Sequence, residues 1–174
     1  MDKHPGYGVW AMAEHLAQVH AVDIIRTFQQ IKRTKDWMAI TVVDRNLQPP
    51  GQKIVYPQVS AASPLDRANM PFQGTIEDAA PVNLQLKLIT MDDIAFFCLN
   101  GELCTEIGLH LKEASPLKHT FIITHTAERA GYLPTKRGYD NHTAEFYASE
   151  VKDGCTEERL IPAALEMFEE RLKD

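Results

Sequence analysis

The sequence lacks several features that mark common functional classes. It has three cysteines, Cys98, Cys104 and Cys155, an odd number without the close spacing of a zinc ribbon or a redox motif. It has no run of lysine or arginine, and its formal net charge is −6. Because a phosphate backbone requires a basic surface, nucleic acid is not an expected partner. The cysteines are expected to be reduced and buried, as in a cytoplasmic protein.

Long hydrophobic runs are also missing. No segment approaches the roughly 20 apolar residues that cross a bilayer, and the first residues lack the hydrophobic region of a signal peptide. The chain is therefore expected to be soluble and cytoplasmic, without a transmembrane segment. Its 174 residues, of which 44% are hydrophobic, are enough for one globular domain over residues 1–174.

Hydrophobic periodicity predicts a long helix near each end of the chain. Apolar residues recur on one helical face in 8–32 and again in 156–172, where Thr156 is the expected N-cap. The segments between them favour strands, with one further helix at 103–114. The predicted strands are 37–43, 82–88, 94–99 and 120–124, with an edge strand at 144–151. We therefore expect an α/β fold of the α+β type, a mixed sheet with helices packed on it.

The segment 48–81 is predicted to be a long proline-rich loop. It holds six of the ten prolines, which interrupt regular structure. Within it, the piece at 65–69 could be helical. A loop of this length inside a compact domain is usually functional, mobile or covering.

Glu102 and Tyr132 are the residues with the clearest chemical potential. Glu102 follows an apolar strand and a glycine that permits a change of direction, so we expect it at the start of the 103–114 helix. Such strand ends are where α/β sheets bind ligands, although a first-turn acid also stabilises its own helix. Tyr132 lies in the segment GYLPT (131–135), which can equally be a turn with a packing tyrosine.

Histidines supply further candidates for a metal site. Glu102, Glu106 and His110 share one face if the helix includes all three, a geometry that metals can use. The same spacing is also typical of an ordinary solvent-exposed helix face. His119 and His125 would share a strand face, with His125 at the C-terminal end. A hydrogen-bonded structural histidine is the alternative for both.

In order and spacing, these segments resemble the end of the neutral ceramidase catalytic domain. The matching parts cover roughly the last 90 residues. They are CLNGE (98–102), the following helix, the strand at 120–125, GYLPT (131–135), residues 143–145 and the final helix. Asn100, Ala127 and Ala144 depart from the family pattern. The first helix and the strand near Val42 resemble the region just upstream.

The resemblance implies a zinc-dependent amide hydrolase. In such enzymes two histidines, a glutamate and a tyrosine hold the zinc ion that activates water. The resemblance places Glu102 and Tyr132 on the glutamate and tyrosine positions, with His125, Glu145 and Thr135 as supporting residues. It places both histidines upstream of this chain.

The chain is accordingly expected to be a fragment or truncated relative of a ceramidase-like amidohydrolase, inactive alone. It would act on N-acylated lipid or amide substrates if a missing N-terminal half completed the site. Apolar surface left uncovered would favour a homo-oligomer. The alternative is a non-catalytic interaction or small-ligand module that keeps the fold and binds no metal.

Overall fold

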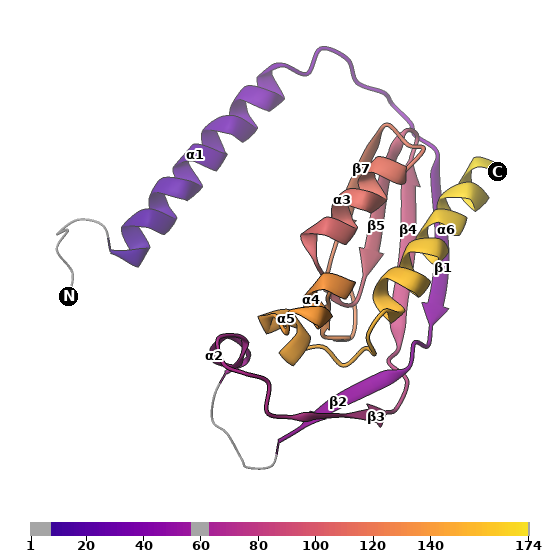
Figure 1. Ribbon diagram of the computed structural model, residues 1–174. Helices are drawn as coiled ribbons and strands as arrows, with labels where there is room; N and C mark the ends of the chain where they lie inside the picture. The colour runs from indigo at the N-terminus through magenta and orange to yellow at the C-terminus, as the bar shows by residue number, and fades with distance from the viewer. Residues whose placement is uncertain (1–7, 57–62, 174) are drawn as a thin grey trace. The chain divides into compact units, whose positions relative to one another are not determined.

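The computed structural model describes residues 8–56 and 63–173 (Figure 1). By its internal contacts the chain divides into two compact units, Met1–Met38 and Ala39–Asp174. The single domain expected over residues 1–174 stays a prediction. Among the described residues, no helix is long and apolar enough to cross a membrane.

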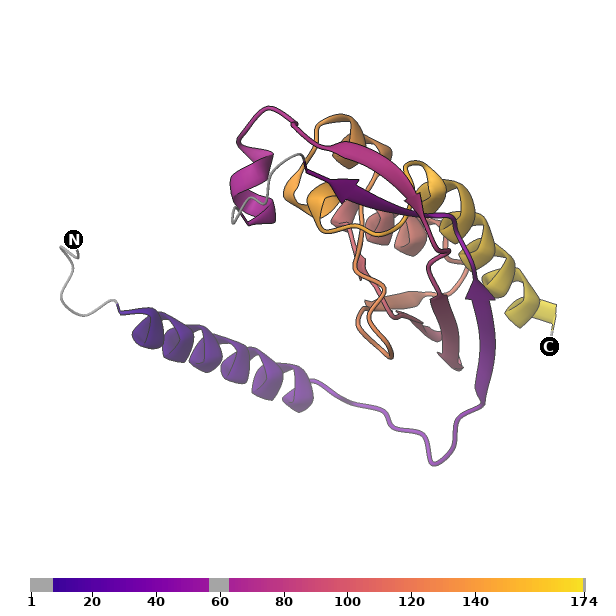
Figure 2. The ribbon, with the colours of Figure 1, turned by 90° about the horizontal axis from the view of Figure 1, so that it is seen from below.

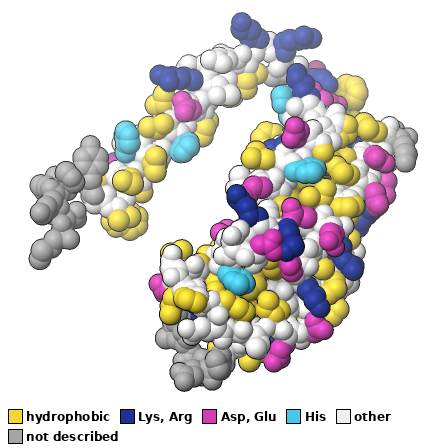
Figure 3. Space-filling view, viewed as in Figure 1, with side chains coloured by type: hydrophobic (Ala, Val, Ile, Leu, Met, Phe, Trp, Pro, Cys, Tyr) yellow, Lys and Arg dark blue, Asp and Glu magenta, His cyan; other side chains and the backbone are white. Residues whose placement is uncertain are grey.

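The first unit contains one long helix, α1 (Val9–Gln29), which confirms the predicted N-terminal helix. It begins after Gly8 and ends slightly earlier than expected. No residue of α1 is buried in the described structure, and Trp10 is 87% exposed. Hydrophobic side chains lie at the surface along this helix (Figure 3). The amphipathic pattern therefore predicts the helix correctly, but it does not identify what covers its apolar face.

The second unit is built on a four-stranded mixed sheet in the order β1-β4-β5-β7. The antiparallel members are β1 (Ile40–Leu47), β4 (Leu84–Met91) and β5 (Ile94–Leu99). β7 (His119–Ile123) pairs with β5 in parallel. These strands confirm the mixed sheet and four of the predicted strands. The bounds of β5 are as predicted, and those of the other three are shifted. Asp92, in the turn between β4 and β5, has a φ of 52°.

Two helices cover one face of the sheet, α3 (Thr105–Ala114) and α6 (Ile161–Lys173), as both ribbon views show (Figures 1 and 2). The core lies between them and the sheet because alternate residues of β4 and every second residue of β5 point to this side. The buried side chains include Leu84, Leu86, Leu88, Phe97, Leu99, Ile107, Leu111, Leu160, Met167 and Phe168. A π-helical turn, η1 (Thr156–Leu160), precedes α6, and its N-cap is Cys155 rather than the predicted Thr156.

The opposite face of the sheet exposes apolar side chains. Ile40, Val42 and Phe121 are each more than half exposed. The rings of Phe96 and Phe121 stack on this face with centroids 5.4 Å apart. Apolar surface of this kind was expected from the sequence, and association through it stays a prediction.

The prediction of an irregular loop over 48–81 is wrong in part. β2 (Gly51–Val55) and β3 (Thr75–Ala79) form a two-stranded antiparallel sheet. The short helix α2 (Pro64–Ala68) lies between them and confirms the expected helical piece, whereas residues 57–62 lie outside the described structure. The prolines flank these elements or occupy a first helical position, where proline is tolerated. The number of prolines in the segment therefore led to too irregular a prediction.

The predicted edge strand at 144–151 is also wrong. The first half of this segment forms the short helix α5 (Ala144–Tyr147), which follows another short helix, α4 (Lys136–Asp140). Thr143 is the N-cap of α5, and alanine and glutamate at its start favour a helix. Val151 makes an isolated antiparallel bridge with Gly51.

Candidate functional site

Two short parallel strands bring the predicted metal ligands together. β6 (Glu102–Leu103) pairs with β8 (Tyr132–Leu133), and Glu102 is the register partner of Tyr132. The backbone N–H of Glu102 donates to the carbonyl of Gly131 at 2.9 Å. Two residues from separate sequence motifs therefore lie on adjacent strands at the same level.

Glu102 does not lie in a helix, contrary to the prediction. α3 begins at Thr105 after the N-cap Cys104, because the backbone before it pairs with β8 instead. The expected helical face of Glu102, Glu106 and His110 therefore does not exist. Glu106 makes an ion pair with Arg137, and His110 is exposed on α3.

Gly101 is required for close approach rather than for a change of direction. A Cβ at this position would lie 2.6 Å from Leu133 Cδ1 and 3.2 Å from the carbonyl oxygen of Gly131. A larger residue would push β8 away from Glu102. The change of backbone direction occurs at Gly131, whose φ is +70°, a value that favours glycine.

Asn100 anchors the segment that leads into the site. Its side chain is buried, with Oδ1 accepting from the Gln85 N–H and Nδ2 donating to the Asn83 carbonyl, both at 2.9 Å. Its own carbonyl accepts from the N–H of Ala130 at 2.9 Å. Sequence reasoning treated Asn100 as a departure from the family pattern and missed this role. A polar side chain directly after an apolar strand was the available signal, since buried polar groups need partners.

His125 lies beside Glu102. Its Nε2 is 3.3 Å from Oε2 of Glu102, and its backbone N–H donates to the carbonyl of Gly101 at 3.4 Å. The alternation that would place His119 and His125 on one strand face fails, because β7 ends at Ile123. His125 has a φ of 58°, in the left-handed region.

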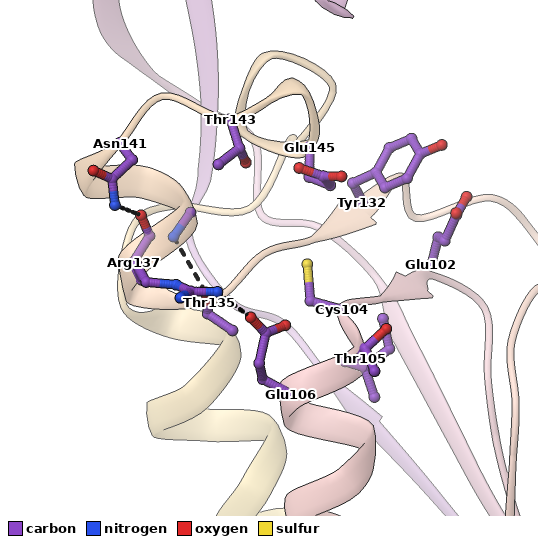
Figure 4. A pocket seen from close by; sticks show the side chains of 12 residues that line it. Glu102, Cys104, Thr105, Glu106, Tyr132, Thr135, Arg137, Asn141, Thr143 and Glu145 are labelled. Atoms are coloured by element: carbon purple, nitrogen blue, oxygen red, sulfur yellow. Dashed lines mark hydrogen bonds and ion pairs between the residues drawn. The ribbon is translucent and has the colours of Figure 1, made fainter. Parts of the chain in front are cut away.

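Glu102 and Tyr132 line a pocket of about 460 Å³. Figure 4 shows them at one end of it and Arg137 at the other, with Glu145 close to Tyr132. The lining includes three glutamates and one arginine, which is already paired with Glu106. The pocket is therefore polar and predominantly acidic.

The Glu102 carboxylate changes the chemistry of its neighbour. It raises the pKa of the Tyr132 phenol, through a hydrogen bond and through its negative charge. Without a cation nearby, the phenol therefore stays neutral and donates to the carboxylate. A metal ion at the same place would have the opposite effect on a phenol.

The other two predicted supporting residues lie in the same pocket with different roles. Glu145, in the first turn of α5, has its carboxylate on the Tyr132 side (Figure 4). Thr135 is the N-cap of α4, and its hydroxyl accepts from the N–H of Gly138 at 3.1 Å. That hydroxyl is thus committed to the helix start.

The thiols are free, as predicted, and Cys98 and Cys155 are buried. Cys104 lines the pocket and is partly buried. Burial raises the pKa of the Cys104 thiol, and the pKa of Cys98 is raised for the same reason. Because the thiolate is the nucleophile and metal ligand, Cys104 is poorly suited to either role at neutral pH.

In the described ranges 8–56 and 63–173, no group of three or more His, Cys, Asp and Glu side chains is placed to hold a metal ion. A site around Glu102 and His125 would therefore need the phenol of Tyr132 as a further donor. Comparison of the chain with family models, with curated protein sequences and with solved structures gave no match.

Proposed function

We propose that this chain carries part of the metal site of a ceramidase-like amide hydrolase, with Glu102 and Tyr132 as two of its ligands. The main support is the pairing of β6 with β8, which makes these two residues register partners beside a polar pocket. The resemblance in motif order had singled out the same two residues independently of any contact between them.

The donor chemistry fits a divalent transition metal. Carboxylate and phenolate oxygens are hard anionic donors that Zn²⁺ accepts, and both side chains are only partly buried. Zinc, when bound, supplies the Lewis acidity that polarises an amide carbonyl and lowers the pKa of a water molecule. Glu102 and Tyr132 would hold the ion at one end of the pocket (Figure 4).

The substrate class we propose is an N-acylated lipid or another N-acyl amide. Catalytic zinc sites use about three protein ligands. With Glu102 and Tyr132 as the sole ligands, the chain should hydrolyse such amides weakly, and a histidine donor should raise the rate. A cytoplasmic location, which the free thiols favour, stays a prediction.

Release of fatty acid from N-acyl sphingoid bases and N-acyl amino acids, measured at saturating Zn²⁺ and high protein concentration, tests this proposal. We expect slow, zinc-dependent release that falls by at least about tenfold in Glu102→Gln and in Tyr132→Phe, since each removes a ligand. His119→Gln, on β7, is the matched control and should leave the rate unchanged. Release that is indifferent to both substitutions would contradict the proposal.

The alternative is a non-catalytic interaction module, and one observation favours it. The open sheet face exposes Ile40, Val42 and Phe121, and apolar patches of this kind bind partners. Neither metal binding nor amide hydrolysis would then be observed.

A second copy of the chain is the partner that we expect on this face. Light scattering should report a concentration-dependent dimer or larger oligomer, and Phe121→Asp should shift it toward the monomer. Leu109→Asp, at an exposed position of α3, should not. A wild-type monomer at high concentration would refute association through this surface.

A further inference from the structure

We infer that His125 is a third ligand of the proposed metal site, so that Glu102, Tyr132 and His125 of this chain bind a zinc-type divalent ion without a donor from another segment. The inference rests on the proposed function, because it assigns a ligand to the same site. Three separate segments supply the donors: β6, β8 and the loop after β7.

The backbone holds His125 against the strand that carries Glu102. The N–H of His125 donates to the carbonyl of Gly101, the residue before Glu102. The N–H of Thr126 donates to the carbonyl of Leu99 at 3.1 Å, at the end of β5. The backbone of His125 is thus held beside Gly101 and Leu99 by two hydrogen bonds.

The conformation of His125 is itself unusual. Its φ of 58° is one that residues other than glycine rarely adopt, and it persists where the surrounding structure determines it. Because β7 ends at Ile123, this turn is what directs the chain back toward Glu102.

Nε2 of His125 and Oε2 of Glu102 lie within hydrogen-bond distance, and their separation also matches that of two ligand atoms on one ion. Charge-assisted hydrogen bonds are usually about 2.7–2.9 Å long, whereas Nε2 of His125 lies 3.3 Å from Oε2 of Glu102. Two donors that each lie about 2.0–2.1 Å from a tetrahedral zinc ion are about 3.3–3.4 Å apart. The observed distance therefore leaves room for one ion between them.

Access and charge agree with this assignment. The side chains of His125 and Glu102 are 56% and 44% exposed, so an ion can reach them from solvent. The Glu145 carboxylate acts on Tyr132 in addition to that of Glu102, and Arg129 opposes them. Two carboxylates and one arginine thus act on the Tyr132 phenol, a balance that favours a cation there.

Titration of the full chain with Co²⁺ tests the inference without an activity assay. The visible absorption bands of bound Co²⁺ report its coordination, and competition with Zn²⁺ gives the zinc affinity. We expect one ion per chain and at least about tenfold weaker binding in each of His125→Gln, Glu102→Gln and Tyr132→Phe. All three positions are partly exposed, and circular dichroism should confirm that the variants fold.

His119→Gln and His110→Gln are the matched controls, and both should bind Co²⁺ as the wild type does. If Glu102→Gln and Tyr132→Phe weaken binding but His125→Gln does not, the inference is overturned and the proposed function stands. Binding that depends on His110 instead of His125, or no binding by the wild type, also overturns it. Binding that is indifferent to Glu102 and Tyr132 would overturn the proposed function as well.

Discussion

Replacing Phe97 with alanine is expected to lower the free energy of unfolding by about 3–5 kcal/mol. Phe97 is fully buried in the middle of β5, and its ring centroid is 6.0 Å from that of Phe168 on α6. On the flanking strands its register partners are Leu88 and Ile122. The substitution removes apolar contacts from the centre of the core and leaves a cavity that the rigid sheet can fill only in part. Urea unfolding followed by circular dichroism measures the loss.

Phe121→Ala is the matched control for this substitution. Phe121 is 51% exposed on the open face of the same sheet, so its removal should cost less than about 1.5 kcal/mol. Both variants should be compared at low protein concentration, where association through the open face is weakest. Equal losses for the two substitutions would contradict the assignment of the core to the helix-covered face.

A second large effect is expected at Tyr139, whose hydroxyl is the centre of a buried hydrogen-bond group. Tyr139 is buried in α4, and its hydroxyl donates to the carbonyl of Val151 at 2.6 Å and lies 3.0 Å from the hydroxyl of Ser149. Tyr139→Phe keeps the ring and removes the donor. Because the Val151 carbonyl then loses its closest partner, we expect a loss of about 1–3 kcal/mol at neutral pH.

The same residue should make the protein sensitive to alkaline pH. Burial raises the pKa of Tyr139 from 10.0 to about 12. Between these values the unfolded chain releases the phenolic proton while the folded chain keeps it, so the free energy of unfolding falls as the pH rises. Below pH 10 this contribution is fully present, and it amounts to at most about 3 kcal/mol, since one pKa unit corresponds to about 1.4 kcal/mol.

Urea unfolding at a series of pH values from neutral to strongly alkaline checks this prediction. The wild type should lose stability more steeply above pH 10 than Tyr139→Phe does. Phe121→Ala is the control, since it removes no titratable group and should leave the slope unchanged. Parallel curves for the wild type and Tyr139→Phe would show that Tyr139 does not titrate as proposed.

The main sheet could be predicted because its strands carry their own signals. Alternation along β4 identified the residues that are now buried under α3 and α6, and the continuous apolar run of β5 indicated a central strand. The prolines of 48–81 misled the prediction because they lie beside β2 and β3 rather than within them. Residues 144–151 show no clear hydrophobic periodicity, so the sequence did not distinguish a strand from a helix. In the structure a short helix begins at Ala144.

The candidate site was predicted in part. The resemblance pointed to Glu102 and Tyr132, and His125 was expected near the end of its strand. The structure adds the close approach at Gly101 and the buried side chain of Asn100. The place of Asn100 after an apolar strand was a signal for a buried polar group. The partners could not be deduced beforehand, because each lies elsewhere in the sequence: Leu133 for Gly101 and Asn83 for Asn100.

By itself the sequence determined the helices at both ends, the alternation of the main strands and the residues worth testing as ligands, because these follow from local periodicity and residue chemistry. Only the tertiary structure decided that Glu102 pairs with Tyr132 in a short strand instead of starting the helix. It also decided that the turn at His125 brings this residue beside Glu102. The pairing of β6 with β8 joins segments separated by α3 and β7. Its geometry depends on backbone hydrogen bonds and close packing that no local pattern encodes.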